Sequence, residues 1–483
     1  MEKIQLIPDA STLIESQRSI GYSFETALAD ILDNSISADG THIEIQFQNQ
    51  SEAGVAFVSI MDNGRGMRKE ELTQALRYGS KKISQERAIN DLGRFGLGLK
   101  MASFSQCRKL TVCSKQEDQL VAFYWDLDVV EQLNDWVIIQ LNEEEIEKIP
   151  QINALKETNS GTIVLWEKFD KFDKSKAFEL MFDECLNEAT NHVALVFHKY
   201  IEEGTIEISF NGREVAPVNP YFIKNIKTQP RPSNPIRIGK NQIEVKPYII
   251  PYQKYLSQEE RKIMQTYPTL QQGLYIYRNK RLISWGKWFR LFKSNELANL
   301  AKISIEIPNN MDDLWEVDVK KSTIRIPLSV RDELKKFIKK AVGESKRVYK
   351  KSGRARNPKE LAHVFNKHES VEGEVSYFLN TELPVYQALV ETFDDAQSQM
   401  FDSLLKQIQS NIPWEAMRYD LANGKTIERQ LPKEEEVYEE VSLLLSLQTG
   451  KASKRHLLNT LFKIENYQGY ENILERIRGE IDD

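Results

Sequence analysis

Two glycine-rich segments, Asp62–Met67 (DNGRGM) and Gly93–Lys100 (GRFGLGLK), constrain the fold of this 483-residue chain more than any other feature. The first follows a β-branched, apolar run at Val55–Met61, and the second opens into a helical stretch at Leu99–Ser105. Glycine tolerates positive φ and lets the backbone approach a ligand closely. Backbone N–H groups in such a loop, together with a helix N-terminus, can bind an anion. Further strands are expected at His42–Gln48, Lys109–Ser114, Leu120–Asp126 and Thr162–Glu167. Strands and helices mixed in this order predict an α/β sandwich.

A second unit is expected to follow a helical stretch around Ala177–Glu202. Alternating apolar residues at Ile206–Phe210 end in Asn211-Gly212, which predicts a hairpin. Gly273–Arg278 and Arg281–Ser284 predict another strand pair, and the proline-rich Gln229–Pro235 predicts a loop. From about residue 331 the pattern is helical, and we expect the acidic stretch Lys433–Glu440 to interrupt it.

A predicted amphipathic helix precedes both loops. Residues 21–39 place four apolar side chains on one helical face, namely Phe24, Leu28, Ile31 and Leu32. Asp30 and Asn34 lie four positions apart and therefore share a face of that helix. A carboxylate and an amide presented together can position a water molecule and a Mg²⁺ ion, because Mg²⁺ prefers oxygen ligands. A solvated polar face is the simpler explanation of this pair when it is taken alone.

Each loop also carries only a weak signal by itself. Asp62 at a strand end can accept a hydrogen bond from an exocyclic amine, but Asn63-Gly64 is also an ordinary turn sequence. Gly93–Gly98 has the glycine spacing of a Walker A loop, but Leu99 stands where that loop has lysine, and no Ser or Thr follows Lys100. The dinucleotide pattern G-x-G-x-x-G is also absent. Gly161-Thr162 opens an apolar strand and is uninformative alone.

Taken in order, these four segments resemble the N, G1, G2 and G3 boxes of the GHKL ATPase superfamily. That superfamily includes the gyrase B subunit, the ninety-kilodalton heat-shock chaperone, sensor histidine kinases and MutL. The stretches ALADILDNSISAD, MDNGRGM and LGRFGLGLKMAS are most similar to MORC-type ATPases and their prokaryotic relatives. The resemblance spans residues 20–170 and extends more loosely to residue 330.

The resemblance implies a fold and a division into domains. Residues 1–175 would form an α/β (α+β) two-layer sandwich of the GHKL (Bergerat) ATP-binding type. Residues 176–330 would form an α/β transducer-like domain, since GLYIYRNKRLI at 273–283 is similar to that domain in MORC and gyrase-type proteins. Residues 331–483 would hold a basic segment and a mostly helical C-terminal region.

The resemblance also assigns residues to the base of ATP. Asp62 would accept a hydrogen bond from the adenine amino group, and Thr162 would support it through water. Gly64 and Gly66 would leave room for the base, and Met67 would pack near the ring.

A second group of residues would serve the phosphates. Asn34 would coordinate the Mg²⁺ that bridges them. The phosphate-binding lid would include Gly93, Gly96, Gly98 and Lys100, and its mobile part would be Ser80–Asp91. A lysine of the transducer-like domain would reach the γ-phosphate. Lys321 is preferred, and Lys320 is the alternative. Without such a role, the two lysines would simply be a pair of basic residues on the surface.

Asp30 departs from the family pattern, because the general base of the N box is glutamate. Aspartate is one methylene shorter, so it can orient water with poorer reach. We therefore expect an ATPase in which nucleotide binding is intact and hydrolysis is slow.

The distribution of charge does not decide whether the chain binds DNA. The chain has a net charge of −6, but residues 331–360 hold twelve Lys or Arg against four Asp or Glu. This segment fits a DNA-binding stripe, or the solvated face of an amphipathic helix whose other face carries Leu334, Ile338 and Val342. A homodimer formed on ATP binding and a protein effector bound by the C-terminal helices are further expected partners.

Composition excludes several classes. No apolar run approaches the ~18 residues of a membrane helix, no signal peptide is visible, and three cysteines without metal spacing fit a reducing cytosol. We expect a cytoplasmic, nucleotide-gated ATPase in a DNA-linked or antiviral-defence complex. The alternative is a chaperone-like or scaffold switch that recruits a protein effector.

Overall fold

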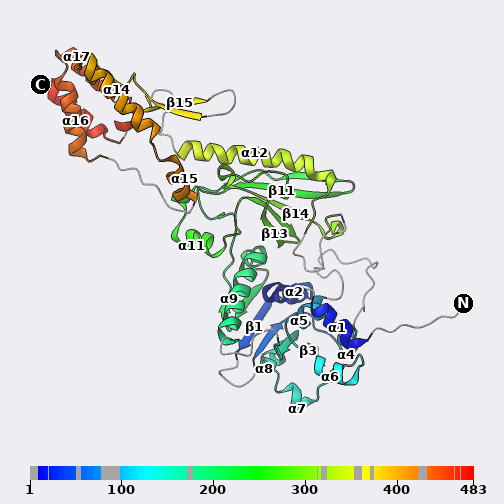
Figure 1. The fold of residues 1–483 in the computed structure, drawn as a ribbon. Helices are drawn as coiled ribbons and strands as arrows, with labels where there is room; N and C mark the ends of the chain where they lie inside the picture. Colours follow the sequence, from blue (N-terminus) through cyan, green and yellow to red (C-terminus); the bar gives the residue numbers. More distant parts are fainter. Residues whose placement is uncertain are drawn as a thin grey trace. The chain divides into compact units, whose positions relative to one another are not determined.

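The computed structural model describes residues 9–19, 21–49, 56–77, 98–170, 178–312, 314–316, 324–352, 362–369, 375–422, 432–461, 463–467 and 469–482. The chain divides into two compact units, Met1–Tyr349 and Lys350–Asp483. Figure 1 shows the elements of both units. Among the described residues, no helix combines the length and the hydropathy that a bilayer crossing requires.

An eight-stranded mixed sheet opens the first unit, in the order β5-β4-β3-β6-β2-β1-β7-β8. Its strands are β1 (His42–Gln48), β2 (Phe57–Asp62), β3 (Lys109–Gln116), β4 (Gln119–Asp126), β5 (Ile139–Gln140), β6 (Ser160–Glu167), β7 (Glu207–Phe210) and β8 (Arg213–Glu214). Six of these strands, β1 to β4, β6 and β7, were predicted, and all six are present, although β7 was assigned to the second domain. Neighbouring strands run antiparallel except β1 and β7, which are parallel.

Helices cover one face of this sheet and enclose the main core. They are α1 (Ala10–Arg18), α2 (Phe24–Ser37), α4 (Lys69–Leu76), α5 (Gly98–Phe104), α6 (Leu127–Leu133), α9 (Phe178–Val196) and α10 (His198–Glu202). Leu28 and Leu32 of α2 are fully buried in this core, and α2 contacts both α5 and α9 (Figure 1). The apolar face predicted for residues 21–39 is therefore the face that packs on the sheet.

Two short helices cover part of the opposite face. Helices α7 (Glu143–Ile146) and α8 (Ile152–Glu157) bury Ile152 and Leu155 against Ile163 of β6. Side chains of successive strand residues point to opposite faces, so β6 contributes to both cores. The first domain is thus a sheet with one large helical layer and one small one.

The first sheet continues past the boundary predicted between residues 175 and 176. The Asn211-Gly212 hairpin, assigned to the second domain by sequence, joins the first sheet because β7 pairs with β1. A parallel pair needs a crossover connection, and α9 supplies it by packing on α2. The first domain therefore extends to about residue 215, where Val215 still lies in its core.

The second sheet has six strands in the order β10-β11-β14-β12-β13, with β9 beside β11. The strands are β9 (Gln229–Pro230), β10 (Asn234–Ile238), β11 (Asn241–Ile249), β12 (Gly273–Arg278), β13 (Arg281–Lys287) and β14 (Ala301–Ile307). Its helices are α11 (Gln258–Thr266), α12 (Leu328–Ser352) and the 3₁₀ turns η1 (Gln253–Tyr255), η2 (Glu296–Ala298) and η3 (Asn309–Met311). The β12–β13 pair was predicted, whereas Gln229–Pro235, predicted as a loop, contains β9 and the start of β10.

Helix α12 spans the boundary predicted between residues 330 and 331. Its apolar side chains Val330, Leu334 and Ile338 are buried in the core of the second sheet. The amphipathic pattern of the basic segment thus belongs to this core. The first unit includes α12 as far as Tyr349.

The second unit combines helices with one hairpin. Its elements are β15 (Phe365–Glu369), β16 (Val375–Leu379), α13 (Pro384–Val390), α14 (Asp395–Ser410), α15 (Trp414–Ala422), α16 (Glu434–Ser446), α17 (Lys451–Leu461), η4 (Glu465–Tyr467) and α18 (Glu471–Asp482). The hairpin was not predicted. The acidic stretch 433–440, expected to interrupt the helical pattern, begins α16 instead, because three glutamates in the first turn favour a helix N-terminus.

Lys302 gives the second sheet a pH-dependent stability. Its ammonium is fully buried, Nζ donates to the carbonyl oxygen of Pro220 at 2.8 Å, and the rings of Phe222 and Tyr275 lie 5.4 and 5.3 Å away. Burial lowers the pKa of Lys302 to about 7. Because the unfolded chain keeps an ordinary lysine, it binds more protons than the folded one between this pKa and the unfolded value, so stability rises with pH there.

We expect Lys302→Met to remove this dependence. Between about pH 7.5 and pH 9.5 the wild-type protein should gain up to ~2.7 kcal/mol in free energy of unfolding relative to the variant. Urea unfolding at both pH values measures the difference, and Lys335→Met, at a half-exposed helix position, is the control. Equal slopes for wild type and Lys302→Met would contradict the assignment.

Candidate functional site

Asp62 ends β2 with a buried carboxylate. Ser35 Oγ on α2 donates to Oδ2 at 2.7 Å, and the Gly64 N–H donates to Oδ1 at 2.9 Å. Burial raises the pKa of Asp62, while these hydrogen bonds act in the opposite direction. Each carboxylate oxygen can accept more than one hydrogen bond, so Asp62 is a fixed acceptor with remaining capacity.

Hydroxyl groups continue from Asp62 across the sheet. Thr162 of β6 stands opposite Asp62 in the strand register, and Ser114 of β3 stands opposite Thr162. The two hydroxyl oxygens lie 3.0 Å apart, and Ser114 Oγ accepts from the Met67 N–H at 2.9 Å. Thr162 and Met67 were predicted here. Ser35 and Ser114 were missed, because an isolated serine in a helix or strand gives no pattern.

Glycines let the first loop pack against the strands. Gly66 has φ +64°, and a Cβ there would lie 1.9 Å from the Lys115 carbonyl oxygen. At Gly161 a Cβ would lie 2.2 Å from the Asp62 carbonyl oxygen, and at Gly64 it would lie 2.9 Å from Asp62 Oδ1. Gly66 and Gly161 are therefore required by backbone packing. Gly64 is required beside the carboxylate itself.

We expect Gly161→Ala to destabilise the first domain by about 3 kcal/mol or more, because the backbone of β2 or β6 must move. Gly343→Ala is the matched control. Its site on α12 has no heavy atom within 4 Å of an added Cβ, so alanine there should stabilise by about 0.5–1 kcal/mol. Urea unfolding followed by tryptophan fluorescence compares the two. A loss below about 1 kcal/mol at Gly161 would contradict the packing argument.

The predicted water-positioning pair lies on α2 but differs in exposure. Asn34 is exposed, whereas Asp30 is only 2% exposed. The Tyr22 hydroxyl donates to Asp30 Oδ2 at 3.1 Å. Asp33, on the same helix, is fully buried and forms an ion pair with Arg281 of β13, Nε to Oδ1 at 2.9 Å. Arg281 was not identified as part of this site from the sequence, because it lies about 250 residues further along the chain.

The second glycine loop is described only from Gly98, which begins α5. Gly93 and Gly96 lie outside the described residues, as do Ser80–Asp91, Lys320 and Lys321. Lys100 is buried, and its Nζ donates to the carbonyl oxygens of Ala75 and Arg77 at 2.7 and 3.0 Å. These carbonyls are at the C-terminal end of α4, where a cation is favourable. A role of Lys100 at a phosphate stays a prediction.

A magnesium ion fits the site only as part of a nucleotide complex. Among the described residues no group of three or more His, Cys, Asp and Glu side chains could hold a metal ion. Asn34 is exposed on α2, and its side-chain amide oxygen is one candidate ligand. Mg²⁺ is commonly bound through few protein ligands together with phosphates and water.

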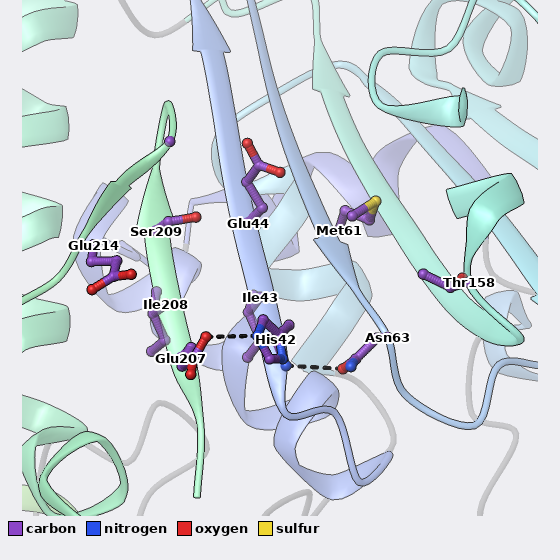
Figure 2. Close-up of a pocket in the computed structure, with 11 residues that line it drawn as sticks. His42, Ile43, Glu44, Met61, Asn63, Thr158, Glu207, Ile208, Ser209 and Glu214 are labelled. Atoms are coloured by element: carbon purple, nitrogen blue, oxygen red, sulfur yellow. Dashed lines mark hydrogen bonds and ion pairs between the residues drawn. The ribbon is translucent and has the colours of Figure 1, made fainter. Parts of the chain in front are cut away.

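A cavity of about 460 Å³ lies on the other face of the sheet (Figure 2). Glu44 and Met61 line it, and they alternate along β1 and β2 with the core residues Ile45 and Ile60. His42 pairs with Glu207 at 2.6 Å at its edge. Glutamates in the lining are unsuited to a phosphorylated ligand. The cavity is therefore separate from the Asp62 site, which faces α2.

Comparison with known proteins agrees with this geometry. Residues 22–162 match the family described as histidine kinase-, DNA gyrase B-, and HSP90-like ATPase. The mismatch-repair protein MutL of Colwellia psychrerythraea is 34% identical over 100 residues, which are 20% of this chain and 15% of that protein. MutL of Dictyoglomus turgidum is 29% identical over 142 residues, 28% of this chain and 24% of that protein.

A MORC protein and a solved structure are also similar. ATPase morc-1 of Caenorhabditis elegans is 32% identical over 98 residues, 20% of this chain and 11% of that protein. The crystal structure of the N-terminal domain of a DNA repair protein aligns over 71% of this chain and 99% of that one, with 15% identity and a TM-score of 0.43. The matched segments thus span less than a quarter of the curated relatives.

The fold and the site define a mixed α/β domain with a buried acceptor carboxylate between a glycine loop and a helix. The family match gives that class a name: residues 22–162 match the GHKL-type ATPase family, and this part of the chain is similar in sequence to segments of MutL and MORC proteins.

Proposed function

We propose that the protein binds ATP with Mg²⁺ at the Asp62 site and hydrolyses it slowly. The observation that carries the proposal is the buried Asp62 carboxylate, fixed by Ser35 and Gly64 at the end of β2. A fixed, desolvated acceptor selects a ligand that donates a hydrogen bond, because an unpaired buried carboxylate is costly. The exocyclic amine of adenine is such a donor.

The neighbouring residues supply the remaining interactions in this proposal. Thr162 would hold a water molecule beside the base, and Asn34 would ligate Mg²⁺, which neutralises phosphate charge when bound. Asp30 would orient the attacking water. Its one-methylene deficit relative to glutamate is the reason for slow turnover.

We further propose that ATP acts as a gate. Binding would order the lid that contains Gly93, Gly96, Gly98 and Lys100, and Lys321 would reach the γ-phosphate from the second domain. Contacts of this kind exist only while the γ-phosphate is present, so hydrolysis would reset the gate. The N-terminal regions of two chains would pair in the closed state. The homology to MutL and MORC supports this proposal.

The gate is tested by measuring the mass of the purified protein in solution with and without a non-hydrolysable ATP analogue. We expect the wild-type mass to double with the analogue and Mg²⁺, and Asn34→Ala to remain a monomer. Asp39→Asn, at an exposed position just after α2, is the control and should behave as wild type. An unchanged wild-type mass under saturating analogue would remove the gate and leave nucleotide binding standing.

DNA is the partner that the structure of α12 favours. One face of α12 is buried in the core, and its exposed face carries Lys335, Lys336, Lys339, Lys340, Lys346 and Arg347. Lys335 and Lys336 pair with Asp332 and Glu333. The other four cations lie along about two and a half turns and could follow a phosphate backbone.

Charge reversal at Lys339, Lys340, Lys346 and Arg347 is expected to abolish duplex binding at low salt. Binding that survives the reversal would overturn the DNA proposal. Co-purification of one protein partner without DNA stimulation of turnover would favour the alternative, a switch that recruits an effector through the C-terminal helices.

A further inference from the structure

An arginine of the second sheet reaches the helix that carries Asp30. Arg281 is the first residue of β13 and is only 3% exposed. Its Nε lies 2.9 Å from Asp33 Oδ1, and its Nη2 lies 3.5 Å from Asp30 Oδ1. One guanidinium therefore bridges two carboxylates that are one helical turn apart on α2.

Both oxygens of the Asp30 carboxylate have a contact. Oδ1 faces the Arg281 guanidinium, and Oδ2 accepts the hydrogen bond from the Tyr22 hydroxyl. Asp33 makes the shorter contact and anchors the arginine. Two buried carboxylates close together repel each other, and an uncompensated buried charge is strongly destabilising. The guanidinium offsets this repulsion.

The turn before Arg281 is fixed by contacts from α10 and the residues that follow it. Asn279 and Lys280 both have positive φ, as in a two-residue hairpin turn. The Tyr200 hydroxyl donates to the Asn279 carbonyl oxygen at 2.5 Å, and Lys280 pairs with Glu203. The Arg281 guanidinium also lies 5.8 Å from the ring centre of Phe197. The position of Arg281 thus depends on how the β12–β13 hairpin docks.

We propose that Arg281 is a positioning residue for Asp30, anchored by Asp33, and that it makes ATP hydrolysis depend on docking of the β12–β13 hairpin against α2. The inference rests on the proposed function, in which Asp30 orients the attacking water. A short aspartate tolerates little misorientation, since small displacements of a catalytic group cost large factors in rate. Arg281 pairs with α2 carboxylates and not with Asp62, so nucleotide binding does not need it.

Arg281→Met is the first test. We expect kcat for ATP to fall by at least about tenfold, with the Kd for a non-hydrolysable ATP analogue unchanged within about twofold. Arg281→Lys keeps the charge but lacks the planar fork that reaches both carboxylates, so its kcat should lie between those of Arg281→Met and the wild type. Lys287→Met removes an exposed cation at the other end of β13 and should leave both values unchanged.

Asp33→Asn tests the anchor. It should lower kcat by itself, and the Asp33→Asn, Arg281→Met double variant should fall no further than either single variant, because both changes remove one bridge. If Arg281→Met does not fold, Arg281→Lys and Asp33→Asn carry the test. An unchanged or raised kcat in folded Arg281→Met, or additive losses in the double variant, would overturn the inference.

Asp30→Asn shows whether a negative result excludes only the positioning role of Arg281 or the proposed function as well. If Asp30→Asn abolishes turnover and the Arg281 variants do not change it, only the positioning role is wrong. If wild-type protein binds ATP without hydrolysing it, or Asp30→Asn turns over normally, the proposed hydrolytic role of Asp30 fails and the inference falls with it.

Discussion

Asp62→Ala is expected to weaken binding of ATP by roughly 100-fold, because a charge-assisted hydrogen bond to a buried carboxylate contributes about 1.5–3 kcal/mol. The loss also leaves Ser35 Oγ and the Gly64 N–H without the acceptor they have now. Calorimetric titration with a non-hydrolysable ATP analogue measures the effect. Thermal unfolding of the variant shows separately whether the domain is still folded.

Two controls make this result specific to the base. Asp39→Ala removes a carboxylate that is 88% exposed and should leave the Kd unchanged. Asp62→Asn keeps the size of the side chain and should reduce the preference for ATP over GTP. A Kd for Asp62→Ala within about threefold of wild type, in a folded protein, would exclude Asp62 from the adenine site.

Asp30→Asn is expected to lower turnover by about 100-fold or more while nucleotide binding is retained, because an amide cannot take up a proton from the attacking water. The opposite change, Asp30→Glu, should raise turnover by about tenfold, since glutamate supplies the missing methylene. Steady-state phosphate release with saturating Mg-ATP measures both.

The glutamate variant is the more discriminating of the two. Asp30 is buried between Tyr22 and Arg281, so a longer side chain must keep both contacts to act. A turnover of Asp30→Glu no faster than wild type would sink the idea that aspartate limits hydrolysis. Tyr22→Phe is a useful companion, since it removes only the hydroxyl that donates to Oδ2.

Sequence patterns located the first domain because its signals are local. The helix at 21–39, the strands around it and the two glycine loops follow from periodicity and glycine spacing, and the structure confirms Asp62 and Thr162 as neighbours. Asp62 and Thr162 are adjacent because β2 and β6 pair in an antiparallel register. The order of the motifs alone does not predict that register, and only the family resemblance implied it.

Contacts distant in sequence were missed for a physical reason. The pairing of β7 with β1 spans a crossover helix, and the Arg281 bridge joins residues about 250 positions apart. Neither leaves a periodic trace in the chain. The basic segment at 331–360 showed its amphipathic pattern, but only the packing of α12 shows which core that pattern serves.

A structure of the protein with a non-hydrolysable ATP analogue and Mg²⁺ tests the central claim most directly. We predict the adenine amino group within hydrogen-bond distance of an Asp62 carboxylate oxygen and Mg²⁺ beside the Asn34 amide oxygen. Nucleotide bound instead in the cavity between β1, β2 and β7, or no bound nucleotide at saturating concentration, would contradict it.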